Sequence, residues 1–230
     1  MGSNRREFLV STAAFGAVGL AAARADEKNK PQEEVGATED LMREHGVLNR
    51  ILLIYEEGLR RLRTKEDVAP EVFHSAATLV RTFVEDYHEK LEENYIFPEF
   101  EKKKRLVDLV KILRMQHQAG RTMTDVILRN AVADRFRRDD RRGQLVLSVE
   151  AFIRMYRPHE AREDTVLFPA IHKILPAKQI KELGEQFEKE EDKLFGEEGF
   201  EKTVDRVAAI EKQLGIYNLS QFTPKLARKQ

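Results

Sequence analysis

The sequence predicts an all-α fold, a four-helix bundle of two similar helical hairpins followed by two shorter C-terminal helices. Three observations support this fold. Apolar residues recur three and four positions apart along most of the chain, which is the spacing of one helix face. Runs rich in Val, Ile and Thr are scarce, whereas the helix formers Glu, Lys, Arg, Leu and Ala are abundant. The pattern of the first hairpin also returns in the second, 71 or 72 residues later.

The composition excludes several classes of site. The 230 residues are 41% hydrophobic, which is enough to bury a core, and their formal net charge is zero. This balance gives no reason to expect nucleic acid or an anionic membrane surface as a partner. The chain has no cysteine, so disulfides, thiolate ligands, iron–sulfur clusters and attached c-type haem are excluded. Any bound metal must be held by histidines and carboxylates.

The first 25 residues predict an export signal. Residues 4–9 contain paired arginines and resemble the twin-arginine motif, and sixteen uncharged residues run from Phe8 to Ala23. Ala25 ends a small-x-small cleavage site. A membrane span needs ~20 strongly apolar residues, so we expect a cleaved signal and no stable membrane span afterwards. The expected location is periplasmic or otherwise exported, with the twin-arginine export machinery as a partner.

The first hairpin of the bundle is marked by capping and proline signals. Thr38 is expected to be the N-cap of the first helix, which should end near Thr64. Pro70 suits the first turn of the second helix. This helix should continue until Pro98 kinks or ends it, because proline removes a backbone hydrogen bond.

The second hairpin repeats this pattern. Its first helix is expected over residues 105–133, and the mixed Arg and Asp cluster over 135–142 predicts a solvated turn. The last bundle helix contains Pro158, so we expect one continuous but kinked helix that runs to about Leu175. The extension should hold two helices, over 177–195 and 199–214. The chain therefore divides into a signal (1–25), a linker (26–37), the bundle (38–175) and a C-terminal helical extension with a tail (176–230).

One motif occurs twice and predicts a metal site. Residues 88–98 and 159–169 both read H-E-x-x-E-[ED]-x-x-[IL]-F-P, and a further histidine precedes each copy. Residues four apart share a helix face, and the neighbouring aromatic residues mark this face as the core face. Buried imidazoles and carboxylates are tolerable when they bind cations, and they suit iron, manganese and zinc. The predicted ligands are His45, His88, Glu92, His117, His159 and Glu163.

The spacing predicts how these ligands are shared. Each preceding histidine lies 42 or 43 residues ahead of its motif histidine, which places all four at one level of the bundle. Each half would bring two histidine nitrogens to one metal. Glu92 and Glu163 can each bridge two ions ~3.5–4 Å apart. With a shared oxo or hydroxo group, two six-coordinate ions retain about two open positions, for Glu89 or Glu160, water, or a small molecule.

These six residues resemble the hemerythrin-like family, the HHE cation-binding domain, over residues 38–175. The resemblance implies an up-down four-helix bundle with a non-haem di-iron centre that binds dioxygen or responds to oxygen and iron. The cofactor would be two iron ions, oxo- or hydroxo-bridged, although the donors also suit manganese or zinc.

The sequence departs from oxygen-carrying hemerythrins at one ligand. Those proteins have five histidines, two of them four residues apart on one helix. Here Leu113 and Arg121 stand four residues from His117, so the fifth histidine is absent. The gap argues against reversible oxygen carriage and leaves Glu89 or Glu160 to complete the metal shell. A solvated or salt-bridged role for these two glutamates is an equal alternative.

Three functions follow as expectations. The first is an exported di-iron protein that binds dioxygen, or another small diatomic or peroxide ligand, for sensing, scavenging or iron handling. The second is a di-iron oxidase or peroxide-consuming enzyme, and the third is a bundle in which the metal is purely structural. Outside the repeat, His74 and His172 are expected to have surface or structural roles.

Overall fold

The computed structural model describes residues 36–224, which form helices, turns and loops with no strand in that range. The predicted signal, residues 1–25, and all of the predicted linker except its last two residues lie outside this range. None of the helices described combines the length and the apolar character that a membrane span requires.

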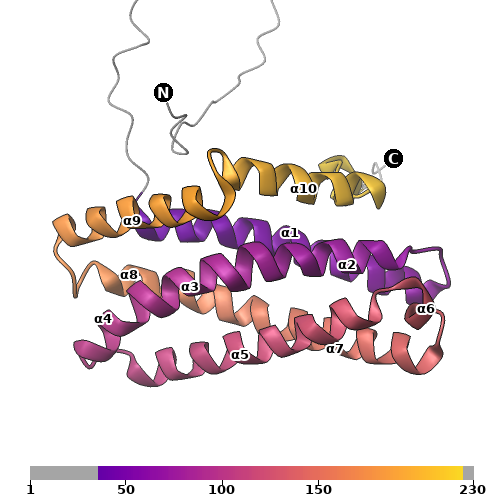
Figure 1. The fold of residues 1–230 in the computed structure, drawn as a ribbon, viewed down its shortest axis with the longest axis horizontal. Coiled ribbons are helices and arrows are strands. Elements are labelled where there is room, and N and C mark those ends of the chain that lie inside the picture. The colour runs from indigo at the N-terminus through magenta and orange to yellow at the C-terminus, as the bar shows by residue number, and fades with distance from the viewer. Residues whose placement is uncertain (1–35, 225–230) are drawn as a thin grey trace, which may run out of the picture.

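Four long helical rods run side by side and form the bundle (Figure 1). The first rod is α1 (Ala37–Thr64), and α5 (Val107–Asn130) is the third. The second rod is continuous and consists of α2 (Pro70–Leu79), η2 (Val80–His88), α3 (Glu89–Leu91), η3 (Glu92–Ile96) and α4 (Phe97–Lys102). After the short α6 (Ala133–Phe136), the fourth rod consists of α7 (Asp139–Arg162), η4 (Glu163–Leu167) and α8 (Phe168–Ile171). The predicted all-α bundle is confirmed.

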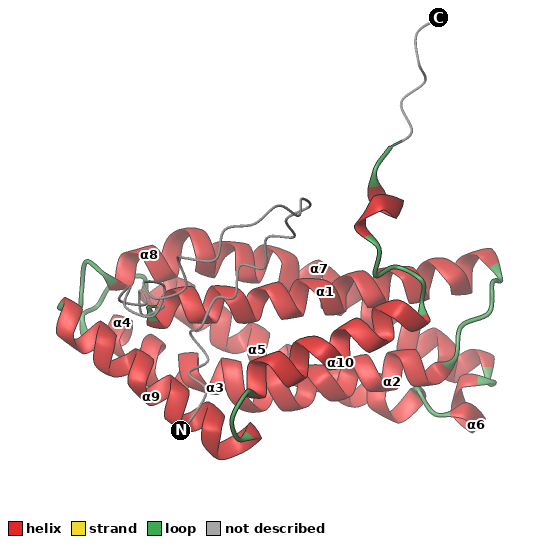
Figure 2. Ribbon diagram, turned by 90° about the horizontal axis from the view of Figure 1, so that it is seen from above, coloured by secondary structure: helices red, strands yellow, loops and turns green. Residues whose placement is uncertain are grey.

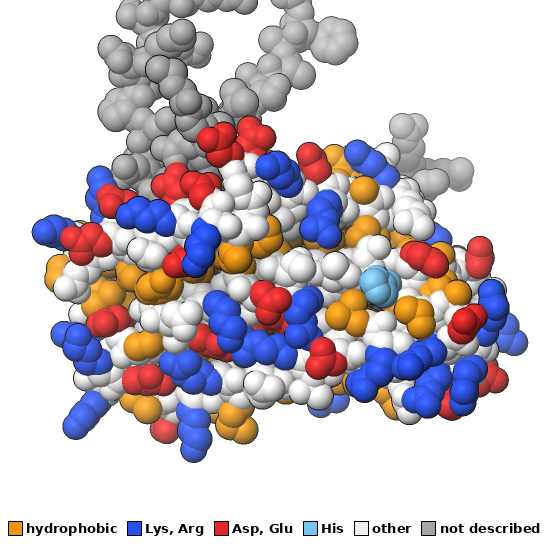
Figure 3. All heavy atoms as spheres, in the orientation of Figure 1, with side chains coloured by type: hydrophobic (Ala, Val, Ile, Leu, Met, Phe, Trp, Pro, Cys, Tyr) orange, Lys and Arg blue, Asp and Glu red, His pale blue; other side chains and the backbone are white. Residues whose placement is uncertain are grey.

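The C-terminal extension covers one side of the bundle. It consists of α9 (Ala177–Phe195), α10 (Gly199–Gln213) and the short η5 (Leu219–Phe222). Figures 1 and 2 show α9 and α10 lying along α1 and the second rod. Phe195 and Phe200 pack against Phe83 with ring centroids 5.9 and 6.3 Å apart. Within residues 36–224, no further helix covers the outer side of α5 and α7 (Figure 1). On the face drawn in Figure 3, acidic and basic side chains are interspersed.

Two local expectations were wrong. The N-cap of α1 is Gly36 rather than Thr38, because the Glu39 carboxylate accepts a hydrogen bond from the Gly36 backbone N–H and the helix begins two residues earlier. The predicted turn over 135–142 is also shorter than expected. Helix α7 already begins at Asp139, and acidic residues in its first turn interact favourably with the helix dipole.

The prolines of the two motifs do not end their helices. The Phe97 N–H bonds to the Glu92 carbonyl, and the Phe168 N–H bonds to the Glu163 carbonyl, each spanning five residues rather than four. These wider π-turns directly precede Pro98 and Pro169. A proline ring clashes with the carbonyl four residues earlier, and the π-turn displaces that carbonyl. Both rods therefore continue past the motif.

Candidate metal centre

Four histidine rings meet in two pairs in the middle of the bundle. The Nε2 atoms of His45 and His88 are 3.0 Å apart, and those of His117 and His159 are 3.2 Å apart. All four residues are at most 4% exposed. Two nitrogen ligands at right angles on an ion ~2.1 Å away would lie about 3.0 Å apart. The separation within each pair therefore matches two ligands of one cation.

Two glutamates connect the histidine pairs. The Oε2 atom of Glu163 lies 3.1 Å from Nε2 of His159 and 3.4 Å from Nε2 of His45. The Oε2 atom of Glu92 lies 3.4 Å from Nε2 of His117 and 3.8 Å from Nε2 of His88. Each carboxylate thus reaches one histidine of each pair. Two groups of three potential ligands result, His45 with His88 and Glu92, and His117 with His159 and Glu163; a third group, Glu89 with Glu93 and His117, lies beside them.

The carboxylates of Glu92 and Glu163 are buried without hydrogen bonds. Among the described residues, none provides a hydrogen bond to any of their four oxygens. Burial, with Glu163, Glu89 and Glu44 nearby, raises the pKa of Glu92 well above its ordinary value. Burial also acts to raise the pKa of Glu163. The nearby His159 and His45 outweigh this effect and hold the pKa of Glu163 well below its ordinary value. Buried carboxylates without hydrogen bonds are costly, and a bound cation would satisfy them. The residues therefore fit a metal pair.

Each of the four histidines has a hydrogen-bond partner on its outer nitrogen. Such support leaves Nε2 free to face a metal and is a regular feature of histidine ligands. The Nδ1 contacts are His45 with Asp164 at 2.7 Å, His88 with Glu44 at 2.7 Å, His117 with Glu93 at 3.1 Å, and His159 with Gln116 at 2.9 Å.

These four supporting residues were not predicted, although the repeat contains a signal for them. Glu44 and Gln116 directly precede the first histidine of each half, and Glu93 and Asp164 directly follow the bridging glutamates. The motif's Phe-Pro end is also explained. Phe168 stacks on His45 and Phe97 stacks on His117, with centroids 5.6 and 5.4 Å apart. Each ring thus comes from the opposite half of the repeat.

Glu89 and Glu160 lie beside the centre with other partners. Glu89 accepts a hydrogen bond from the Tyr156 hydroxyl at 2.6 Å and forms an ion pair with Arg121 at 2.6 Å. The Oε2 atom of Glu89 lies 4.0 Å from Nδ1 of His117, not from the Nε2 atom that faces the metal position. Glu160 accepts a hydrogen bond from the Asn49 amide at 2.9 Å. Glu89 falls in the third group of potential ligands, with Glu93 and His117, whereas Glu160 falls in none of the three groups.

All six histidines lie in the described part of the chain. His74 and His172, the two outside the centre, are both exposed, as expected.

The structure also shows the surroundings of Leu113 and Arg121, which stand where a fifth histidine would lie. Leu113 is buried in the core. Arg121 points to Glu89 and Glu93, with contacts of 2.6 and 2.8 Å.

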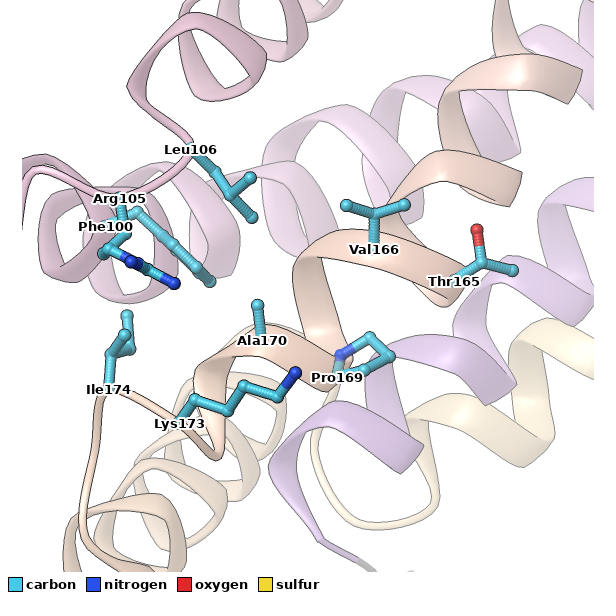
Figure 4. A pocket seen from close by; sticks show the side chains of 9 residues that line it. All are labelled: Phe100, Arg105, Leu106, Thr165, Val166, Pro169, Ala170, Lys173 and Ile174. Carbon is cyan, nitrogen blue, oxygen red and sulfur yellow. The ribbon is translucent and has the colours of Figure 1, made fainter.

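A groove reaches the centre from the uncovered side of the bundle. It has a volume of about 460 Å³, lies between α5 and α7, and is lined by Gln116 and His159 among mostly apolar side chains. A second pocket of about 320 Å³ lies where the turn after α4 meets η4 and α8 (Figure 4). Arg105 and Lys173 line that pocket, whereas no histidine or carboxylate does among its described lining residues. It is therefore separate from the centre.

Comparison with known proteins agrees with this geometry. The sequence model of the Hemerythrin HHE cation binding domain matches residues 36–171 and, in a second match, residues 108–226. The uncharacterized proteins Rv1995 of Mycobacterium tuberculosis and Mb2018 of Mycobacterium bovis are each 46% identical over 231 residues, covering 96% of this chain and 91% of their own length. No solved structure matches significantly. On its sequence match, its helical bundle and its His–Glu clusters, the chain belongs to the hemerythrin HHE cation-binding family.

Proposed function

We propose that the protein is a non-haem di-iron protein that binds dioxygen or a related small molecule for sensing, scavenging or iron handling. The observation that carries this proposal is the pair of facing imidazole pairs, joined by two buried glutamates that have no hydrogen bonds. The ligands would be His45, His88, Glu92, His117, His159 and Glu163. Iron, rather than manganese or zinc, is proposed from the resemblance to hemerythrins.

The protein's own residues would position the ions and shield them from water. The outer partners of the four histidines fix the orientation of each ring, and Phe97 and Phe168 cover two of the rings. A pair of iron ions would supply one-electron redox chemistry and open positions for a small ligand. The groove between α5 and α7 would supply the route, because His159 forms part of its lining.

Metal analysis and spectroscopy of the aerobically purified protein test this proposal. We expect about two iron ions per chain and visible oxo-to-iron bands that change when azide or nitric oxide is added. The exposed His172→Ala variant is the control and should keep both metal and spectrum. Fewer than two irons together with a featureless spectrum would falsify the proposal.

A second candidate is a di-iron oxidase or peroxide-consuming enzyme. It is favoured by Leu113 and Arg121 standing where an oxygen carrier has its fifth histidine, since a shell richer in carboxylate favours activation of oxygen over its release. Peroxide turnover by the metal-loaded protein, abolished by Glu92→Ala and kept in the exposed Glu185→Ala variant, supports the enzyme. A metal-loaded protein inert to peroxide and nitric oxide supports a structural role for the metal instead.

Export is proposed separately, on the N-terminal residues alone. The paired arginines, the uncharged run and the small-x-small site motivate delivery by the twin-arginine machinery to the periplasm or beyond. Cell fractionation of the wild type and of a variant with Arg5→Lys and Arg6→Lys tests it. Retention of the variant in the cytoplasm and processing of the wild type after Ala25 are the expected results. An unprocessed wild-type chain in the cytoplasm would contradict export.

A further inference from the structure

The internal repeat makes each half of the centre a reference for the other. Positions 71 or 72 residues apart are equivalent, so the partners of the two histidine pairs can be compared one by one. The bridging glutamates match, and Glu93 is equivalent to Asp164. Three of these positions differ in charge. Glu44 is equivalent to the neutral Gln116, the neutral Asn49 to Arg121, and Lys90 to the neutral Ala161.

Carboxylates support both histidines of the first pair. Asp164 lies 2.7 Å from Nδ1 of His45, and Glu44 lies 2.7 Å from Nδ1 of His88. Glu44 is itself buried and accepts a hydrogen bond from the Tyr87 hydroxyl. A carboxylate that accepts the Nδ1 proton makes Nε2 a stronger donor to a metal. Both nitrogens that face the first cation position therefore have this support.

The second pair has weaker support. Nδ1 of His159 meets the neutral Gln116 amide. Nδ1 of His117 meets Glu93, but this carboxylate also accepts contacts from Lys90 at 2.6 Å and Arg121 at 2.8 Å. The positively charged side chains of Lys90 and Arg121 thus compete with His117 for the carboxylate of Glu93. Arg121 thus places a positive charge beside the carboxylate that supports His117.

We propose that the two metal positions are unequal, and that the His45–His88 position binds its cation first and more tightly. The inference rests on the metal centre proposed above. The groove between α5 and α7 is lined by Gln116 and His159, so it borders the weaker position. Glu44 and Gln116 act through the histidines and are positioning residues.

The test is a titration of the full chain after its metal has been removed with a chelator. Cobalt(II) is added during calorimetry, and crystals grown with one equivalent are measured for anomalous scattering. We expect two binding steps that differ by about tenfold or more. With one equivalent, the stronger anomalous peak should lie between His45 and His88.

The repeat supplies matched variants that change the same group in opposite directions. Glu44→Gln should weaken the first step by about 10–100-fold, and Gln116→Glu should tighten the second step and bring the two together. The exposed Glu185→Gln variant is the control and should leave both steps unchanged. Far-UV circular dichroism checks folding. If Glu44→Gln fails to fold, the tighter second binding step expected for Gln116→Glu still tests the inference.

The outcomes separate this inference from the centre on which it rests. Two equal steps in the wild type, a first anomalous peak between His117 and His159, or an unchanged second step in Gln116→Glu each overturns the inference while leaving the centre intact. Absence of any cobalt binding overturns the centre itself, and the inference with it.

Discussion

The carboxylate of Glu163 lies 3.4 Å from Nε2 of His45, although the two residues are 118 positions apart and lie on different hairpins. The equivalent contact joins Glu92 to His117 at 3.4 Å. Each motif thus sends its glutamate to a histidine of the other half. Each hairpin holds one group of three ligands, but the contacts that join the two groups exist only when the hairpins are packed together.

Replacing Glu163 should remove metal from both positions rather than from one. Glu163→Ala takes away a carboxylate that reaches one histidine of each pair. We expect the affinity for each of the two cations to fall by at least about 10–100-fold, measured by calorimetry and by metal content after dialysis. His74→Ala, at an exposed position, should keep full metal content. Loss of a single ion from Glu163→Ala would argue against bridging.

Metal removal should lower the thermal stability of the wild type. It should also reverse the effect of Glu92→Gln on stability, from destabilising with metal to stabilising without it. A cation present at 100 times its Kd stabilises the fold by about 2.7 kcal/mol, or roughly 5–11 °C in Tm for a chain of this size. Without metal, Glu92 is a buried carboxylate among other carboxylates, so its amide should be more stable by about 1 kcal/mol or more. Thermal melts with and without a chelator measure both effects. A lower Tm for Glu92→Gln in the metal-free protein would contradict this account.

Two glycines on exposed and packed helix faces should respond to alanine in opposite ways. A Cβ on Gly120 would overlap the hydroxyl of Tyr156, the group that donates to Glu89. Gly120→Ala should therefore cost about 1–3 kcal/mol in the free energy of unfolding. Gly143, within α7, has no atom within 4 Å of an added Cβ in the described structure. Gly143→Ala should stabilise by about 0.5–1 kcal/mol, measured by chemical denaturation.

A large side chain in the groove between α5 and α7 should slow the entry of small ligands. Ile112 lines this groove and is 52% exposed, so Ile112→Trp can narrow the path without disturbing the core. We expect unchanged metal content and a slower rate of azide binding in stopped-flow absorbance. Leu147→Trp places the same ring at a site 67% exposed outside the groove lining. Equal rates in the two variants would place the entry route elsewhere.

Most of the helical framework could be predicted because its signals are local. The end of α1 at Thr64, the start of α2 at Pro70 and the helix at Ala177–Phe195 follow from apolar spacing and from residues near each end. The π-turns before Pro98 and Pro169 were not predicted. Spacing rules assume a uniform helix, whereas these rods contain wider turns, at η2 as well as before Pro98 and Pro169.

The sequence by itself determined which atoms could bind metal and that they occur in two matching sets. Without cysteine, only imidazole and carboxylate remain, and a four-residue spacing on an apolar helix face places them in the core. The tertiary structure alone decided how the sets combine. It places Glu163 against His45. It also makes Glu44 the partner of His88, makes Gln116 the partner of His159, and pairs Arg121 with Glu89 and Glu93. Such contacts depend on the rotation and level of packed helices, which spacing along one chain does not specify.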